Sequence, residues 1–182
     1  MKTFIIYSSG TGNTAKLAYG IRAIFSDNTH IFPIEQAPTC GSADLYLLGF
    51  WVRRGAPDSR MASYMAQLRH KHVAFFGTLG AYPNSPHAQK VIENTTNLLH
   101  ENTLLGSFLC QGKIHNSLAN AMQANTRLRS SHPMTPERIA RHKEAAKHPN
   151  ADDIHAAQQY FLKIKHQAQT KIGQKRQGAG AD

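Results

Sequence analysis

The sequence is poor in cysteine, in acidic residues and in long apolar runs, and each shortage excludes a class of protein. Its two cysteines, Cys40 and Cys110, form no CxxC pair, so neither a disulfide framework nor a cysteine metal centre is indicated, and we expect buried, reduced thiols. No apolar run approaches the roughly 20 residues that cross a bilayer, which argues against a membrane-spanning helix. The apolar start at 4–7 gives way to polar residues before the apolar region of a signal peptide could form. We therefore expect a cytoplasmic protein.

Only 11 acidic residues stand against 21 lysines and arginines, which gives a formal net charge of +10. Such a surface attracts acidic partners and anions in general. The basic residues are spread along the chain without interleaved aromatic residues or a zinc-finger pattern, so nucleic acid is not indicated. Of the 11 histidines only His70 and His72 lie close together, and two candidate ligands alone do not argue for a metal. The expected partner is an acidic protein.

Regular alternation of strand and helix patterns predicts the fold class. Compact apolar runs predict five strands at 4–7, 31–34, 45–50, 72–77 and 104–110, and apolar residues at helical spacing predict helices at 14–25, 61–68 and 87–100. Pro33 places the second strand at a sheet edge. The pattern is typical of an α/β domain with a doubly wound, five-stranded parallel sheet and helices on both faces.

The last third of the chain is less regular. A short helix around Leu118 and Met122 is possible, and a helix begins at Thr135-Pro136-Glu137, where threonine caps and proline occupies the first turn. Asn150 is expected to cap a final helix. That helix has a core-facing stripe made of Ile154, Ala157, Phe161 and Ile164. We expect one domain over 1–170 and a disordered basic tail over 171–182.

The most informative segment is Ser9-Gly10-Thr11-Gly12-Asn13-Thr14, between the first strand and the first helix. Glycines allow close approach of the backbone to an anion, hydroxyls donate hydrogen bonds, and the N–H groups at a helix start add partial positive charge. The segment lacks the Gly-Lys-Ser/Thr of a Walker A loop and the GxGxxG of a dinucleotide-binding loop. We expect it to bind a phosphate group.

This loop resembles the flavodoxin phosphate loop, Ser/Thr-x-Thr-Gly-Asn-Thr, at Ser9, Thr11, Gly12, Asn13 and Thr14. The resemblance covers 1–111 and returns over 133–169. It implies the flavodoxin-like strand order 2-1-3-4-5 and FMN as the cofactor, at the carboxyl edge of the sheet; flavodoxin is itself an example of this rule for ligand sites in α/β sheets.

Flavodoxins hold the flavin ring with two further loops, and both have counterparts here. After the third strand, the candidates are Phe50, Trp51 and Val52. Trp51 would stack on the flavin or, alternatively, anchor its own loop by packing. After the fourth strand, the candidates are Thr78, Leu79 and Gly80, through their backbone groups, and Tyr82. Arg53 and Arg54 lie beside the presumed flavin or form a solvated pair.

Three functions are compatible with this pattern. The favoured one is an FMN-dependent electron carrier, similar to a basic flavodoxin subgroup that donates electrons to a partner reductase or another acceptor enzyme. The second is an NAD(P)H-dependent quinone or nitro-group reductase on the same fold. The third is a basic binding module without flavin. The basic charge departs from the acidic flavodoxins, and Thr-Leu-Gly-Ala-Tyr-Pro replaces their usual loop after the fourth strand.

Overall fold

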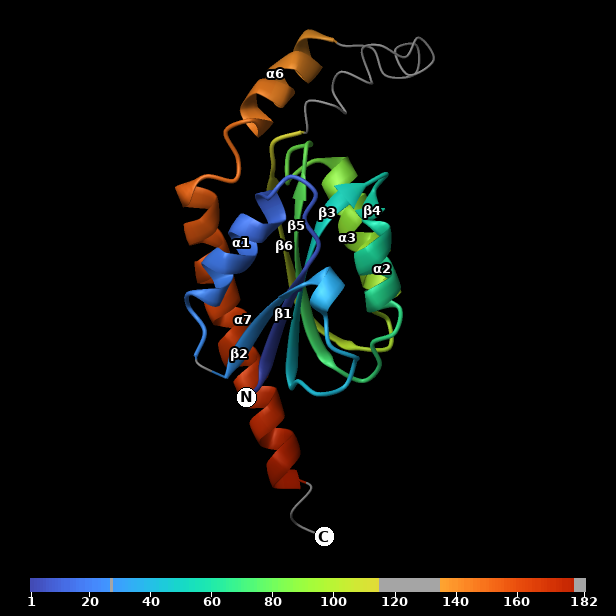
Figure 1. Cartoon of the computed structure of the whole chain (residues 1–182), viewed down its shortest axis with the longest axis vertical. Helices are drawn as coiled ribbons and strands as arrows, with labels where there is room; N and C mark the ends of the chain where they lie inside the picture. Colours follow the sequence, from blue (N-terminus) through green and yellow to red (C-terminus); the bar gives the residue numbers. More distant parts are fainter. Residues whose placement is uncertain (27, 115–134, 179–182) are drawn as a thin grey trace.

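The computed structural model describes residues 1–26, 28–114 and 135–178, and a sheet runs through its centre (Figure 1). The strands are β1 (Thr3–Tyr7), β2 (Thr29–Pro33), β3 (Leu45–Arg53), β4 (Ala56–Pro57), β5 (His72–Leu79) and β6 (Thr103–Gln111). The helices are α1 (Asn13–Arg22), α2 (Ser59–Met65), α3 (Pro86–Leu98), α6 (Pro136–Ala145) and α7 (Ala151–Gly178), with a short 3-10 helix, η1 (Ile34–Gln36). The α/β class with a parallel sheet between helices is confirmed.

The sheet has one more strand than the sequence analysis predicted. Its parallel strands lie in the order β2-β1-β3-β5-β6, and β4 pairs antiparallel with the end of β3. β3 and β4 form a hairpin with a two-residue turn, Arg54-Gly55, whose φ values are 53° and 79°. Two consecutive positive φ values suit the twist of a hairpin, but Arg-Gly is not the usual Asn-Gly signal for this turn. The expectation of five strands was therefore incomplete.

Helices cover both faces of the sheet. α1 and α7 pack on one face with side chains such as Ile5 and Leu47, whereas α2 and α3 pack on the other with side chains such as Ile6 and Leu48. These four side chains are fully buried. Because successive residues of a strand point to opposite faces, burial on both sides explains the nearly continuous apolar runs of β1 and β3.

α7 is longer than the sequence suggested. It continues to Gly178, so the expectation of a disordered tail over 171–182 was wrong for 171–178, and 179–182 lie outside the described residues. Lysine, glutamine and arginine are good helix formers, and extending an existing helix costs far less than starting one. Ile172 also packs against the core beneath α1 and α7.

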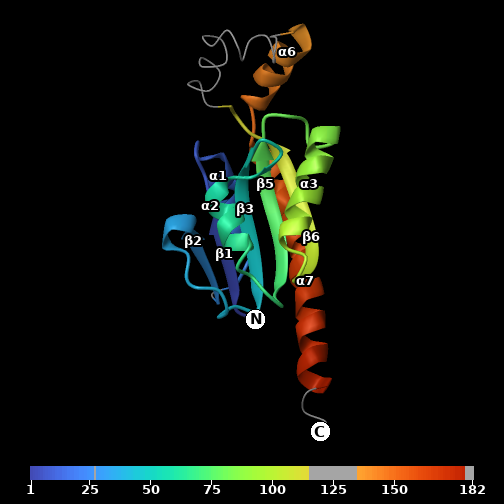
Figure 2. The ribbon, with the colours of Figure 1, turned by 90° about the vertical axis from the view of Figure 1, so that its right-hand side faces the viewer.

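α6 begins as predicted, because Thr135 Oγ1 accepts a hydrogen bond from the Arg138 backbone N–H at 3.3 Å. Figures 1 and 2 both show α6 standing beyond the carboxyl edge of the sheet, past the end of β5. The predicted helix around Leu118 and Met122 falls outside the described residues. Within the described part of the chain, no helix is both long and apolar enough to span a membrane.

Candidate functional site

The loop between β1 and α1 holds Ser9, Gly10, Thr11 and Gly12. Ser9 Oγ accepts a hydrogen bond from the Ala15 backbone N–H at 3.3 Å, which satisfies one amide in the first turn of α1. Gly12 has φ 85°, and a Cβ added there would meet no heavy atom within 4 Å. The turn into α1 therefore needs a glycine, and the space beside that glycine is open.

Backbone N–H groups of this loop are available to a ligand. Gly10, Thr11 and Gly12 are exposed, and none of their amides donates a hydrogen bond to another described residue. They lie at the N-terminus of α1, where the helix dipole places partial positive charge. Unpaired amides gathered at a helix start are well suited to a phosphate group.

Two predicted residues of the loop turn inward instead. Thr14 Oγ1 lies 3.0 Å from Thr78 Oγ1, and both side chains are buried. Asn13 Nδ2 donates to the Lys113 carbonyl at 2.9 Å. These contacts tie the start of α1 to β5 and to the segment after β6. At Thr14 the loop can therefore offer a ligand its backbone N–H rather than its hydroxyl, whereas the Thr11 side chain stays exposed.

Trp51 lies near the end of β3, against the loop between β1 and α1. A Cβ on Gly10 would be 3.8 Å from both Cε2 and Nε1 of the indole. The indole N–H is buried and has no hydrogen-bond partner among the described residues, although buried tryptophans usually find one. The backbone at Trp51 is fixed, because its carbonyl accepts the Asp58 N–H at 3.1 Å.

Phe50 and Val52, the chain neighbours of Trp51, differ in how exposed their side chains are. Phe50 is fully buried, and its ring centroid lies 5.8 Å from that of Phe75 in the core under α2 and α3. Successive side chains of a strand point to opposite faces, so the Phe50 side chain points away from that of Trp51 and belongs to the core. Val52 is half-buried and pairs with Pro57 of β4.

Thr78 and Leu79, predicted to follow the fourth strand, form the packed end of β5, and the loop after them is exposed at its tip. Thr78 and Leu79 are buried, and the Leu79 carbonyl accepts the Gly112 N–H at 2.9 Å. Gly80 packs against Ile114, whose Cδ1 would lie 2.6 Å from an added Cβ. Tyr82 is 43% exposed, so its ring is accessible to a ligand or a partner.

A buried pair that the sequence analysis missed lies next to the loop between β1 and α1. Ser8 Oγ donates to Asp58 Oδ1 at 2.9 Å, and the same oxygen caps α2 by accepting the Met61 N–H at 3.4 Å. Asp58 Oδ2 is buried with no partner among the described residues. An aspartate just before the helical apolar spacing of α2 was a capping signal that the sequence did contain, but its bond to Ser8 was not visible locally.

Positive charge lies at one side of the carboxyl edge of the sheet. Arg53 and Arg54 are exposed at the turn of the β3–β4 hairpin, and no ion pair joins either of them to a described residue. The turn itself is held by α3, because Asn94 Nδ2 donates to the Gly55 carbonyl at 2.8 Å. In the described ranges, no group of three or more histidine, cysteine, aspartate or glutamate residues is placed to hold a metal.

Known proteins resemble this chain over most of its length. A model of the flavodoxin domain matches residues 4–162. The flavodoxin-like domain-containing protein BilS of Clostridioides difficile (strain CD3) is 30% identical over 165 residues, which cover 88% of this chain and 94% of that protein.

Solved structures share the fold. Rubredoxin oxygen:oxidoreductase from Desulfovibrio gigas superposes with a TM-score of 0.56 at 12% identity, over 93% of this chain and 36% of that one. A flavoprotein from Lactobacillus acidophilus NCFM, crystallised in complex with FMN, has a TM-score of 0.50 at 16% identity, over 59% of this chain and 92% of that one.

Proposed function

The chain belongs to the flavodoxin domain family, and from this premise we propose that it binds FMN and passes electrons to a partner reductase or another acceptor enzyme. The observation that carries the proposal is the loop between β1 and α1. Its three amides at Gly10, Thr11 and Gly12 donate no hydrogen bond to a described residue, and these exposed residues lie at a helix N-terminus with open space beside Gly12. That arrangement fits the phosphate of FMN.

The rest of the edge has groups suited to a planar, partly polar ring. FMN would supply the redox chemistry when bound. Trp51, beside Gly10, would stack on one side of the ring. Its indole N–H has no hydrogen-bond partner among the described residues and could donate to an acceptor on the ligand. Tyr82 is the exposed aromatic candidate from the loop after β5. Backbone groups near Gly80 would meet the polar edge of the ring, and buried Phe50 would act only by packing.

The charge distribution favours an acidic protein partner. Arg53 and Arg54 lie on one side of the edge, and α6, which stands beyond it, is rich in basic residues (Figure 1). Burial, together with the charges of Arg138 and Arg141, lowers the pKa of His142 on this helix. Opposite charge on a partner would steer docking and raise the association rate.

The decisive test of the proposal is FMN titration of the apoprotein, followed by flavin absorbance, with a Gly12→Val variant beside wild type. A side chain at Gly12 would intrude on the phosphate, so the variant should lose FMN. Gly41→Val is the matched control, because Gly41 also has a positive φ and open space around it but lies near the amino end of β3. Equal FMN affinity in wild type and Gly12→Val would reject the loop as the phosphate site.

A second measurement separates the carrier from its alternatives. Holoprotein mixed with NAD(P)H and a quinone should not turn over if the protein is a carrier, whereas sustained turnover would identify a self-sufficient reductase. A protein that binds no FMN under any condition would instead be the flavin-free binding module.

A further inference from the structure

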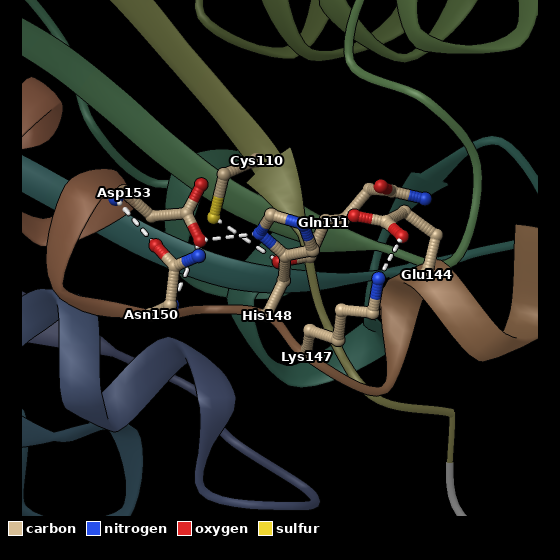
Figure 3. Close-up of polar contacts among 7 residues, drawn as sticks. All are labelled: Cys110, Gln111, Glu144, Lys147, His148, Asn150 and Asp153. Carbon is tan, nitrogen blue, oxygen red and sulfur yellow. Dashed lines mark hydrogen bonds and ion pairs between the residues drawn. The ribbon is translucent and has the colours of Figure 1, made fainter.

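The linker between α6 and α7 contains a histidine held by two carboxylates (Figure 3). His148 Nδ1 lies 2.6 Å from Asp153 Oδ2, in the first turn of α7, and His148 Nε2 lies 3.4 Å from Glu144 Oε1, near the end of α6. Only the protonated imidazole can donate from both ring nitrogens at once. The geometry therefore matches a positively charged ring that bridges the two helices.

The surroundings of the ring favour that charge. The hydrogen bond to Asp153 raises the pKa of His148, against an opposing effect of burial, and Glu144 raises it further. Lys147 is the nearby cation, and it pairs with the other oxygen of Glu144 at 2.6 Å. From β6, Cys110 faces Asp153, and burial together with the Asp153 charge raises the pKa of its thiol, which therefore stays neutral.

The same linker is bonded to the segment after β6. The His148 carbonyl accepts the Lys113 N–H at 3.0 Å, and the Lys113 carbonyl accepts Asn13 Nδ2 at 2.9 Å. Gly112, between β6 and Lys113, packs closely against Asn13, since an added Cβ would lie 2.9 Å from Asn13 Nδ2. Two hydrogen bonds thus connect the backbone of the histidine to the first residue of α1.

We propose that His148 is a positioning residue for the FMN site: protonated and held between Glu144 and Asp153, it fixes the Lys113 peptide and, through that peptide, Asn13 and the phosphate loop. The inference rests on the proposed function. It predicts that FMN affinity depends on the charge of a side chain that does not touch the cofactor.

The direction of the pH dependence follows from the raised pKa. The contacts of the charged His148 ring with Glu144 and Asp153 are intact below the ordinary histidine pKa. They are lost as the pH rises through the raised pKa of His148 in the folded protein. FMN binding should therefore be strongest at mildly acidic to neutral pH and weaken at alkaline pH.

The test compares FMN dissociation constants of wild type, His148→Gln and His155→Gln from pH 6 to pH 9. His155, an exposed histidine on α7, controls for loss of a surface imidazole, and the ratio between variants cancels the ionisation of the FMN phosphate. At pH 6.5 we expect His148→Gln to bind about five- to tenfold more weakly than wild type, a coupling at the lower end of those between sites. The ratio should approach one at pH 9, while His155→Gln follows wild type throughout.

A measurement on wild type alone guards against a variant that folds poorly. By linkage, if the charged ring favours FMN, then bound FMN must favour the charged ring by the same factor. A tenfold effect on FMN affinity corresponds to an increase of about 1 in the His148 pKa when FMN is bound. NMR titration of the histidine ring with and without FMN measures this shift. Equal pKa values in the two states, or a His148→Gln ratio of one at every pH, would overturn the inference while FMN binding itself stood. Absence of FMN binding in wild type would reject both proposals.

Discussion

Thr11 and Thr14 lie three positions apart in the phosphate loop motif, yet we expect substitution of Thr11 to affect FMN affinity and substitution of Thr14 to affect stability. Thr11 is exposed, whereas the Thr14 hydroxyl is buried against that of Thr78 at 3.0 Å. Replacing Thr11 by alanine should therefore weaken FMN binding and leave the free energy of unfolding nearly unchanged. Replacing Thr14 by valine should lower the free energy of unfolding and leave FMN affinity close to wild type.

The magnitudes follow from the hydrogen bonds involved. A bond from the Thr11 hydroxyl to the charged phosphate is worth about 1.5–3 kcal/mol, which is about one to two decades in the dissociation constant. Thr14→Val leaves the buried Thr78 hydroxyl without its partner, at a cost of about 1–3 kcal/mol. Replacing both Thr14 and Thr78 by valine removes the orphaned group, so the double variant should be more stable than the sum of the single effects.

The assays are FMN titration for affinity and urea unfolding of the apoprotein for stability. Thr39→Ala, which removes an exposed threonine between η1 and β3, is the control for loss of a surface hydroxyl. Wild-type affinity in Thr11→Ala would refute the assignment of that hydroxyl to the phosphate. A Thr14→Val variant that loses FMN as strongly as Thr11→Ala would show that the buried contact is not the main role of Thr14.

Three further outcomes are expected. Trp51 is the only tryptophan, and its fluorescence should be quenched as FMN binds to apoprotein. An Arg53→Gln, Arg54→Gln double variant should have a more negative flavin reduction potential by tens of millivolts, from about 0.4 kcal/mol for each charge about 10 Å away in water, and its electron-transfer rate to an acidic partner should vary less with salt. Gly49→Ala should destabilise the fold by about 1–3 kcal/mol, because the new methyl would clash with Cζ of the Phe76 ring.

Each outcome has a contrary result. Unchanged emission on FMN addition would leave Trp51 a packing anchor. An unchanged potential in the double variant would place both guanidinium groups away from the cofactor. For Gly49→Ala the comparison is Gly173→Ala, an exposed helical position with open space, which should gain about 0.5–1 kcal/mol; equal effects at the two sites would contradict the packing described here.

Local sequence patterns were sufficient for most of the elements and for the position of the loop between β1 and α1. Apolar runs located β1 and β3, and Thr135 and Asn150 marked the starts of α6 and α7 as the structure has them. β3 runs on from 50 to Arg53 because its last residues pair with β4 rather than because they are apolar. That extension depends on a turn formed by Arg54-Gly55, which carries no strong local signal.

The side-chain roles within the site required the fold. Thr14 and Thr78 are far apart in the chain, as are Asn13 and Lys113, and no periodicity reports such pairs. The pattern predicted hydroxyl donors at the loop without revealing that one of them is used by the protein itself. The bond from the Lys113 N–H to the His148 carbonyl was missed for the same reason, since it joins the linker before α7 to the segment after β6.

The β3–β4 hairpin gives Trp51 an unusual kind of support for a residue at a ligand site. Its peptide is held by the Asp58 N–H, and the hairpin turn beyond it is bonded to Asn94 of α3. The conformational entropy lost in ordering this segment is therefore incurred when the chain folds rather than when a ligand arrives. A preorganised segment of this kind would change little on ligand binding, and a flavin bound beside it would meet the same contacts in each redox state.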